Sequence, residues 1–231
     1  RYCTYGGAPE GQIHFIASTD FSNIDFFQNI TRRDPNYDFS NLEVYIDGEL
    51  TDQVANSISA NDDVVIKATR GKYPWFGHYT VASSSSQYDI DYIRSIEEPF
   101  PLMHQANGET ITDFRYCFYY CTGLTSIPEG LFDNNTKVTD FRYCFYRCSG
   151  LTNIPEGLFD KNTQVTHFNN CFYRCSKLTV NVQIGSTAST VNVSYFANST
   201  KSKGTVYCRA GSVAYTKFTG TSTANVNVLT Y

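Results

Sequence analysis

Three pairs of cysteines are the residues whose type and spacing could do chemistry. Within each pair three residues separate the cysteines, and the pairs recur every 27 residues: Cys117 and Cys121, Cys144 and Cys148, Cys171 and Cys175. A structural zinc site needs four ligands, and no histidine recurs with the pairs. A disulfide between positions i and i+4 of a helix is geometrically awkward, and a redox pair has two intervening residues. Zinc, disulfide and redox chemistry remain alternatives, but the pattern favours buried reduced thiols, since free cysteine packs as a small hydrophobic side chain.

Tyrosine and arginine form a second periodic set, and they are the candidate binding residues. These two residue types are enriched at interaction hot spots. If neighbouring repeats pair like strands, equivalent side chains lie about 5 Å apart in columns. A packing rim around the core is the competing interpretation of the same columns. The candidate binding residues are Arg115, Tyr119, Tyr120, Arg142, Tyr146, Arg147, Tyr173 and Arg174.

Catalytic signals are missing from the sequence. The histidines His14, His78, His104 and His167 are not at metal-binding spacing with one another or with carboxylates. No glycine-rich phosphate loop and no GxSxG motif is present. We therefore predict no catalytic residue, no metal site and no cofactor, and a protein that is not an enzyme.

The elements that position the cysteines belong to an internal repeat. Residues 112–138 and 139–165 are identical at 22 of 27 positions, and a third copy from Thr166 keeps 10 of its first 15 residues. Phe114, Cys117, Phe118 and Cys121 fall at i, i+3, i+4 and i+7, which is one face of a helix. The following LTSIP segment predicts a short strand. One short helix and one short strand per 27-residue unit predict a mixed α/β solenoid of the leucine-rich-repeat type.

The first part of the chain has no repeat and predicts a small β-sandwich-like domain. Short segments with period-two hydrophobicity, such as QIHFIAS, NIDFFQN, NLEVYIDG, DDVVIKA and GHYTVAS, are separated by turn residues. We place this domain at residues 1–88 and the repeats with a C-terminal cap at residues 89–231. SSSSQ, from Ser83, is the expected junction, and Trp75 is expected to fill a core or interdomain position. Cys3 and Cys208 either pair or remain free.

Composition excludes two partner classes. The formal net charge is −4 and the 18 Lys and Arg residues are scattered, whereas nucleic-acid binding wants a basic stripe or patch. No apolar run approaches the roughly 18 residues of a membrane helix. The chain begins at Arg1 instead of Met, which indicates a mature or trimmed form.

The pattern VTDFRYCFYRCSGLTNIP, from Val138 to Pro155, resembles the BspA-like class of bacterial leucine-rich repeats. Phe145, Cys148 and Leu151 match core positions of that class, while Phe141 and Cys144 stand where it usually has methionine. The segment IPEGLFD and the ending from Gly204 are similar to cell-adhesion lipoproteins of Bacteroides-type bacteria.

This resemblance implies a non-enzymatic adhesion or interaction protein at the cell surface or outside the cell. A lipid anchor beyond this chain would hold it peripherally at the membrane. The expected partner is a protein of a host or neighbouring cell, and the alternative is a surface glycan-binding protein.

Overall fold

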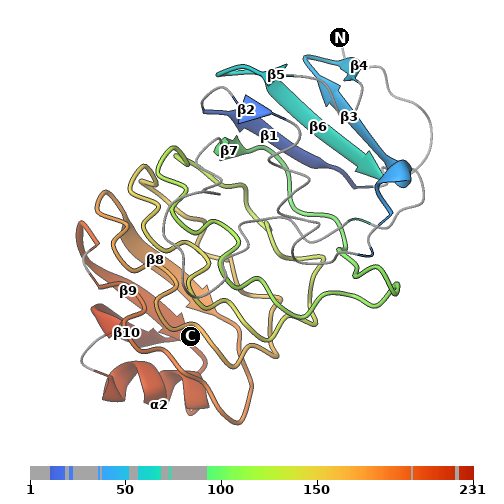
Figure 1. Ribbon diagram of the computed structural model, residues 1–231. Helices are drawn as coiled ribbons and strands as arrows, with labels where there is room; N and C mark the ends of the chain where they lie inside the picture. The colour runs from blue at the N-terminus through green and yellow to red at the C-terminus, as the bar shows by residue number, and fades with distance from the viewer. Residues whose placement is uncertain are drawn as a thin grey trace.

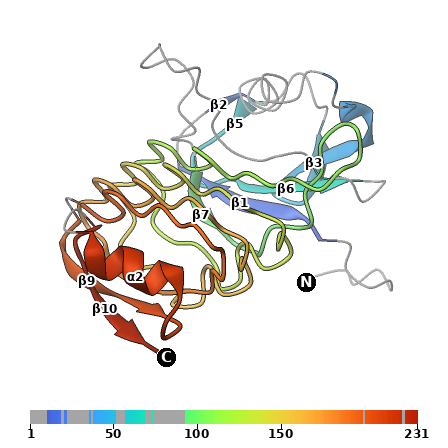
Figure 2. The ribbon, with the colours of Figure 1, turned by 90° about the horizontal axis from the view of Figure 1, so that it is seen from below.

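The protein was examined as a computed structural model, which describes residues 11–18, 21–22, 36, 38–51, 57–68, 73, 93–198, 200–221 and 224–231. A sheet built mainly from the N-terminal part lies at one end of the molecule (Figure 1). The repeats follow in the middle, and a second sheet with one helix closes the other end (Figure 2).

The N-terminal sheet has five strands in the order β4-β3-β6-β1-β7, and all of its neighbours are antiparallel. Alternating apolar residues build it, because one face of each strand turns toward the core. In β1, for example, Ile13, Phe15 and Ala17 are buried. The strands are β1 (Ile13–Ala17), β3 (Leu42–Ile46), β4 (Glu49–Thr51), β6 (Asp63–Ala68) and β7 (Ile93–Ile96). A 3-10 turn, η1 (Phe39–Asn41), precedes β3, and β2 (Phe21–Ser22) pairs with β5 (Ser57–Ile58).

Three of the predicted strands lie where the period-two pattern placed them, as β1, β3 and β6. In its described part this region has a single large sheet and the short β2–β5 pair, in place of the two large sheets of a sandwich. NIDFFQN, GHYTVAS, Trp75, His78, the SSSSQ junction and the boundary at residue 88 lie outside the described residues, as does Cys3.

The repeats lie on one another with equivalent residues in register. The backbone N–H of Phe114 donates to the carbonyl of Asp140 at 2.9 Å, and that of Phe141 donates to the carbonyl of His167 at 2.8 Å. Parallel bridges join Asp113 to Asp140, Asp140 to His167, and His167 to Asn192. Strand β7 continues this pairing, because Thr125 N–H donates to the carbonyl of Arg94 at 2.7 Å. The first repeat therefore packs directly against the N-terminal sheet.

The predicted repeat helix is wrong, and backbone conformation explains why. Tyr116 and Tyr120 have φ of 61° and 60°, in the left-handed region that interrupts a right-handed helix. Between them the chain makes i→i−3 turns, such as Cys117 N–H to the carbonyl of Phe114 at 3.2 Å. At each left-handed residue the N–H instead reaches the next repeat, as from Tyr120 to the carbonyl of Tyr146 at 2.8 Å.

The fold class is accordingly corrected. The described residues are mostly in strands and turns, and they contain one α-helix, α2 (Val213–Gly220), which lies outside the repeats. This mainly β structure contradicts the predicted mixed α/β solenoid, and the leucine-rich-repeat assignment is withdrawn with it. The periodicity measured which side chains are buried, while the backbone between them takes another path.

The C-terminal sheet has three parallel strands in the order β10-β9-β8: β8 (Thr179–Ile184), β9 (Ser202–Cys208) and β10 (Val226–Thr230). Gly204 permits the close approach of β9 to β8, because a Cβ there would lie 1.8 Å from the carbonyl oxygen of Val180. Helix α2 starts at the cap residue Ser212, whose hydroxyl accepts from the N–H of Tyr215. Its Ala214 and Phe218 are buried.

One continuous hydrophobic core links the N-terminal sheet, the repeats and the C-terminal sheet. Phenylalanine rings stack from unit to unit, with centroids 5.8 Å apart between Phe114 and Phe141 and 6.0 Å apart between Phe141 and Phe168. Leu151, in the middle unit, has no exposed surface. Among the described helices, none combines the length and apolar character needed to cross a membrane.

Candidate functional site

A column of stacked tyrosines runs along the outside of the repeats. The rings of Tyr119 and Tyr146 lie 5.0 Å apart at 16° between planes, and those of Tyr146 and Tyr173 lie 5.3 Å apart at 11°. All three side chains are half-buried. Together with their neighbours they form what we call the Tyr/Arg strip, which comprises Tyr119, Tyr120, Tyr146, Arg147, Tyr173 and Arg174.

Two guanidinium groups of the strip lie against these rings. Arg147 lies 4.8 Å from the ring centre of Tyr120 and 5.8 Å from that of Tyr146. Arg174 lies 5.4 Å from the ring centre of Tyr173. Such cation–π contacts contribute about 0.5–1 kcal/mol at exposed sites. Neither arginine forms an ion pair with a carboxylate in the described part of the chain, so the ring contacts position both cations without neutralising them.

The turn geometry directs these side chains outward. Arg147 and Arg174 have φ of 60° and 62°, at positions equivalent to Tyr120. A left-handed residue at the end of each turn reverses the side-chain direction relative to the buried Phe and Cys residues before it. The sequence placed the same residues outside for a different reason, as the far face of a helix. The location is therefore as expected, although the element that produces it is not.

Two further tyrosines join the surface and were not among the candidates. Tyr116 and Tyr143 stack at 5.0 Å with 7° between planes, and Tyr116 meets Tyr119 edge-on at 5.4 Å. Tyr195 lies at the end of the column, 6.3 Å from Tyr173, and is 47% exposed. The 27-residue phase already aligned Tyr116 with Tyr143. Tyr195 could not be found this way, because the repeat pattern has ended before it.

Arg115 and Arg142, the remaining candidates, do not join the strip. Arg142 Nη2 lies 2.6 Å from Asp140 Oδ2, and its Nε donates to the same oxygen at 2.9 Å. Arg115 pairs with Asp113 in the same way, at 2.6 Å and 2.7 Å. The hydrogen bonds from these carboxylates are the main reason why the pKa of each guanidinium is raised. Both arginines are therefore neutralised within their own turns.

The tyrosine rings offer their edges and hydroxyls, because neighbouring rings cover most of their faces. Burial is the first cause that raises the pKa of Tyr119 above its usual value, and the neighbouring Tyr120 adds to it. Burial likewise raises the pKa of Tyr116. These phenols stay protonated at physiological pH and can donate hydrogen bonds. The surface thus combines neutral hydroxyl donors with two cations.

The six repeat cysteines are buried free thiols with no exposed surface, as the packing interpretation predicted. Burial raises the pKa values of Cys144, Cys148 and Cys171 well above the usual range, so these thiols are inert in the folded protein. The described residues contain no group of three or more His, Cys, Asp and Glu side chains that could hold a metal ion.

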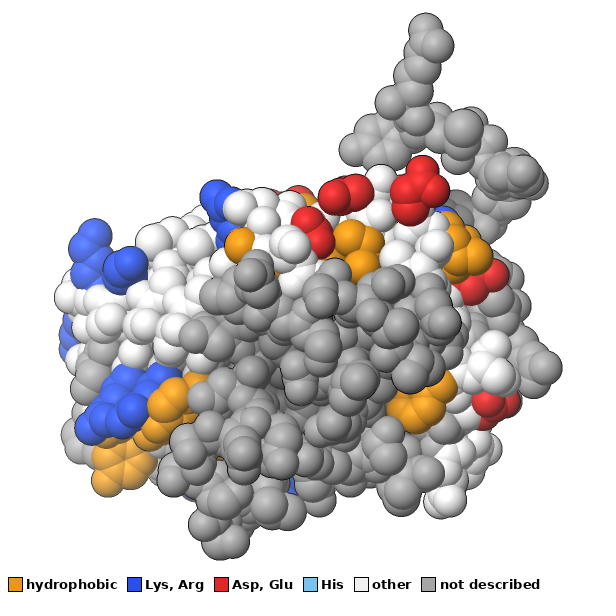
Figure 3. Space-filling model, turned by 45° about the horizontal axis from the view of Figure 1, so that its top comes forward, with side chains coloured by type: hydrophobic (Ala, Val, Ile, Leu, Met, Phe, Trp, Pro, Cys, Tyr) orange, Lys and Arg blue, Asp and Glu red, His pale blue; other side chains and the backbone are white. Residues whose placement is uncertain are grey.

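Charges are separated over the face shown in Figure 3, with most Asp and Glu side chains toward one end and most Lys and Arg side chains toward the other. Comparisons with protein-family models, with curated proteins and with solved structures find no match to this chain. The BspA-like resemblance therefore stays a prediction from the sequence.

Proposed function

We propose that this chain is a non-enzymatic binding protein whose Tyr/Arg strip contacts an acidic surface of another protein. One observation carries the proposal: Arg147 and Arg174 are held against tyrosine rings and have no carboxylate partner in the described residues. A partner that supplies carboxylates would complete these two arginines. Tyrosine and arginine are also the residue types that dominate binding energy in protein interfaces.

A protein partner suits the strip better than a glycan. A sugar ring that stacks on tyrosine needs an open ring face. In the strip those faces are stacked on each other at 5.0 Å and 5.3 Å. The ring edges and hydroxyls that remain suit the varied polar groups of a protein surface, where tyrosine serves as a rigid anchor that loses little conformational entropy.

The proposed setting is the cell surface or the extracellular space, with a lipid anchor outside this chain. This part of the proposal is supported by the sequence resemblance alone. The partner would then be a protein of a host or neighbouring cell.

The test is a binding screen that separates the two partner classes. The wild-type chain is applied to a panel of host extracellular proteins and, in parallel, to a glycan array. We expect protein hits enriched in acidic surfaces, with binding that weakens as salt rises, because exposed charges are screened. The doubly substituted variant Arg147→Ala, Arg174→Ala should weaken binding at least about tenfold, equivalent to about 1.4 kcal/mol.

The matched control is the variant Lys137→Ala, Lys161→Ala, which removes two exposed lysines outside the strip. It lowers the net charge by the same amount and should keep its binding. Both variants should remain folded at the assay temperature, since the lost ring contacts are worth only about 0.5–1 kcal/mol each. An oligosaccharide hit without protein hits, or equal weakening by both variants, would contradict the proposal.

A further inference from the structure

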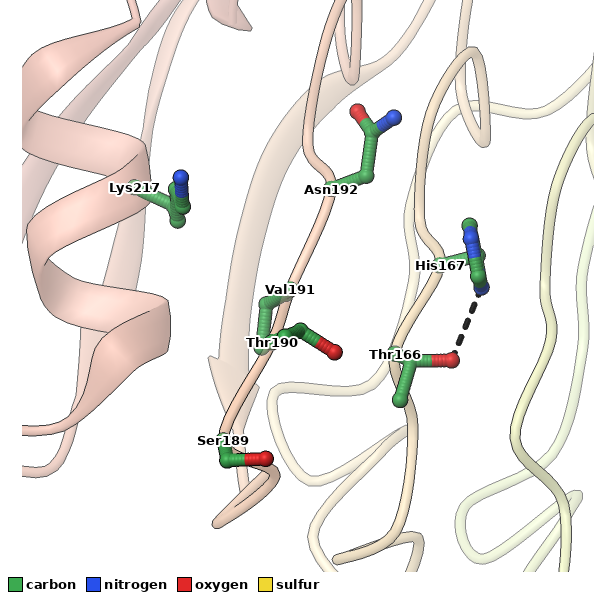
Figure 4. Close-up of a pocket in the computed structure, with 7 residues that line it drawn as sticks. All are labelled: Thr166, His167, Ser189, Thr190, Val191, Asn192 and Lys217. Atoms are coloured by element: carbon green, nitrogen blue, oxygen red, sulfur yellow. Dashed lines mark hydrogen bonds between the residues drawn. The ribbon is translucent and has the colours of Figure 1, made fainter.

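A shallow depression of about 240 Å³ lies beside helix α2, away from the Tyr/Arg strip. Residues from three places in the chain line it: Thr166 and His167 from the third repeat, Ser189, Thr190 and Asn192 from the following segment, and Lys217 from α2. Figure 4 shows Lys217 on one side of the 189–192 segment and His167 on the other. The depression shares no residue with the strip.

Backbone pairing fixes the floor of this depression. Asn192 N–H donates to the carbonyl of Thr166 at 2.8 Å, and His167 forms a parallel bridge with Asn192. The side chain of Asn192 is oriented as well, because its Oδ1 accepts from the N–H of Ser194 at 3.1 Å. The amide Nδ2 is then the group of Asn192 that remains available to donate.

His167 has a defined tautomer. The hydroxyl of Thr166 lies 3.1 Å from the carbonyl oxygen of Thr139 and 2.8 Å from Nδ1 of His167. Its single hydrogen goes to the carbonyl, which can only accept, so Nδ1 of His167 carries the hydrogen that reaches the hydroxyl oxygen. In the neutral ring Nε2 is therefore an acceptor.

Several polar groups around the depression have no partner inside the protein. Ser189, Thr190 and Lys217 are exposed, and their side chains make no hydrogen bond or ion pair with any residue that the structure describes. They converge on one small space with a histidine acceptor and an amide donor. This is the mixture of donors and acceptors that recognises a ligand rich in hydroxyl groups.

The charge around the depression favours an acidic ligand. Lys217 is the cation of its lining, and no carboxylate lines it. The neighbouring position in the second repeat is Asp140, whose charge is neutralised by Arg142 at 2.6 Å. In the third repeat both members of that pair are replaced, by His167 and Asn169. The change of sequence thus removes negative charge from the edge where Lys217 lies.

We propose that this depression binds a hexuronic acid residue of a glycan. The Lys217 ammonium pairs with the sugar carboxylate, and the hydroxyls of Ser189 and Thr190 bond to ring hydroxyls. Nδ2 of Asn192 donates to a further hydroxyl oxygen, and Nε2 of His167 accepts from another. The volume is below the roughly 300–1,000 Å³ of sites for drug-sized ligands, which suits one sugar residue. The binding is weak, with Kd in the millimolar range that corresponds to about −4 kcal/mol.

The test is an NMR titration of the full chain with glucuronate, glucose and acetate, followed through backbone amide shifts. Glucuronate should shift the amides of residues 189–192 with a millimolar Kd, and glucose and acetate should bind at least about tenfold more weakly. Lys217→Gln should weaken glucuronate at least about tenfold, while Ser189→Ala should weaken glucuronate and leave the melting temperature unchanged. The control Lys203→Gln removes an exposed lysine of β9 and should bind as wild type does.

Three results would overturn the inference. Equal binding of acetate and glucuronate would indicate a site for bare anions, and equal binding of glucose would remove the role of Lys217. Absence of saturable shifts at 50-fold above the expected Kd would remove the site itself. Each result is independent of the protein screen, because the strip and the depression have no residue in common.

Discussion

The Sγ atom of Cys148 donates a hydrogen bond to the carbonyl oxygen of Phe118, 3.0 Å away in the preceding repeat. Cys175 repeats this contact with Phe145 at 2.9 Å. The carbonyl of Phe118 also accepts from the N–H of Cys121 at 3.2 Å, so the thiol supplies a second donor. Cysteine therefore fills a small buried position and tightens the contact between repeats, which alanine could not do. The cysteine pairs are architecture.

The first prediction concerns thiol reactivity. Because burial raises the pKa of Cys144, Cys148 and Cys171 well above the usual range, the nucleophilic thiolate is scarce in the folded protein at pH 8. Burial also raises the pKa of Cys208 to about 12. Alkylation of the native chain should leave these cysteines unmodified. In denaturant without reductant, all six repeat cysteines should be labelled, as counted by mass spectrometry. Three disulfides among them would refute the packing account.

The second prediction concerns Leu151, which has no exposed surface. Leu151→Ala should lower the free energy of unfolding by roughly 2–5 kcal/mol, the usual range for a buried leucine. The adjacent Thr152 is exposed, so Thr152→Ala should change stability by no more than about 0.5 kcal/mol. Urea denaturation measures both. A cost near zero at Leu151 would mean that the register of the repeats is wrong.

The third prediction concerns Asn162, which is fully buried and joins two repeats. Its Nδ2 donates to the carbonyl oxygens of Phe132 at 3.3 Å and Asn135 at 3.1 Å. Asn162→Ala removes both donors and should cost about 1–3 kcal/mol, because buried carbonyl groups lose a partner. Asn153→Ala, at an exposed position of the same repeat, is the control and should be near neutral. Equal effects of the two substitutions would argue against a structural role for the buried amide.

Part of this architecture was readable from the sequence. The 27-residue phase identified the buried columns of Phe and Cys, and the period-two pattern located β1, β3 and β6. These predictions succeeded because they rest on which side chains are buried, and burial imposes the period directly. Hydrogen bonding of Arg115 and Arg142 to the aspartate two residues before each was also within reach, since a DFR triplet recurs with the repeat.

The failures arose from contacts between distant parts of the chain. Tyr116 and Tyr120 adopt left-handed φ although neither is Gly, Asn or Asp, and their N–H groups are satisfied only by the next repeat. No local propensity announces such a choice, because its favourable energy comes from stacking. The depression beside α2 was equally hidden, since Lys217 and His167 are 50 residues apart and only the folded chain places them around one space.

The last prediction tests the turn geometry itself through paired glycine and alanine substitutions at Arg174. This residue is exposed and has φ of 62°. Both Arg174→Gly and Arg174→Ala remove the contact with Tyr173, so their difference reports the backbone alone. A left-handed conformation costs an L-residue about 1–2 kcal/mol, so the glycine variant should be more stable than the alanine variant by about 1 kcal/mol.

Thr216, exposed within the true helix α2, supplies the matched control. There the order should reverse, with Thr216→Ala more stable than Thr216→Gly by about 1 kcal/mol, because glycine weakens a helix interior. Urea denaturation of the four variants measures both differences. If alanine were the more stable residue at both positions, the repeat segment would be helical and the left-handed turns described here would be wrong. Opposite signs at the two sites would show that one hydrophobic period can be produced by two different backbones.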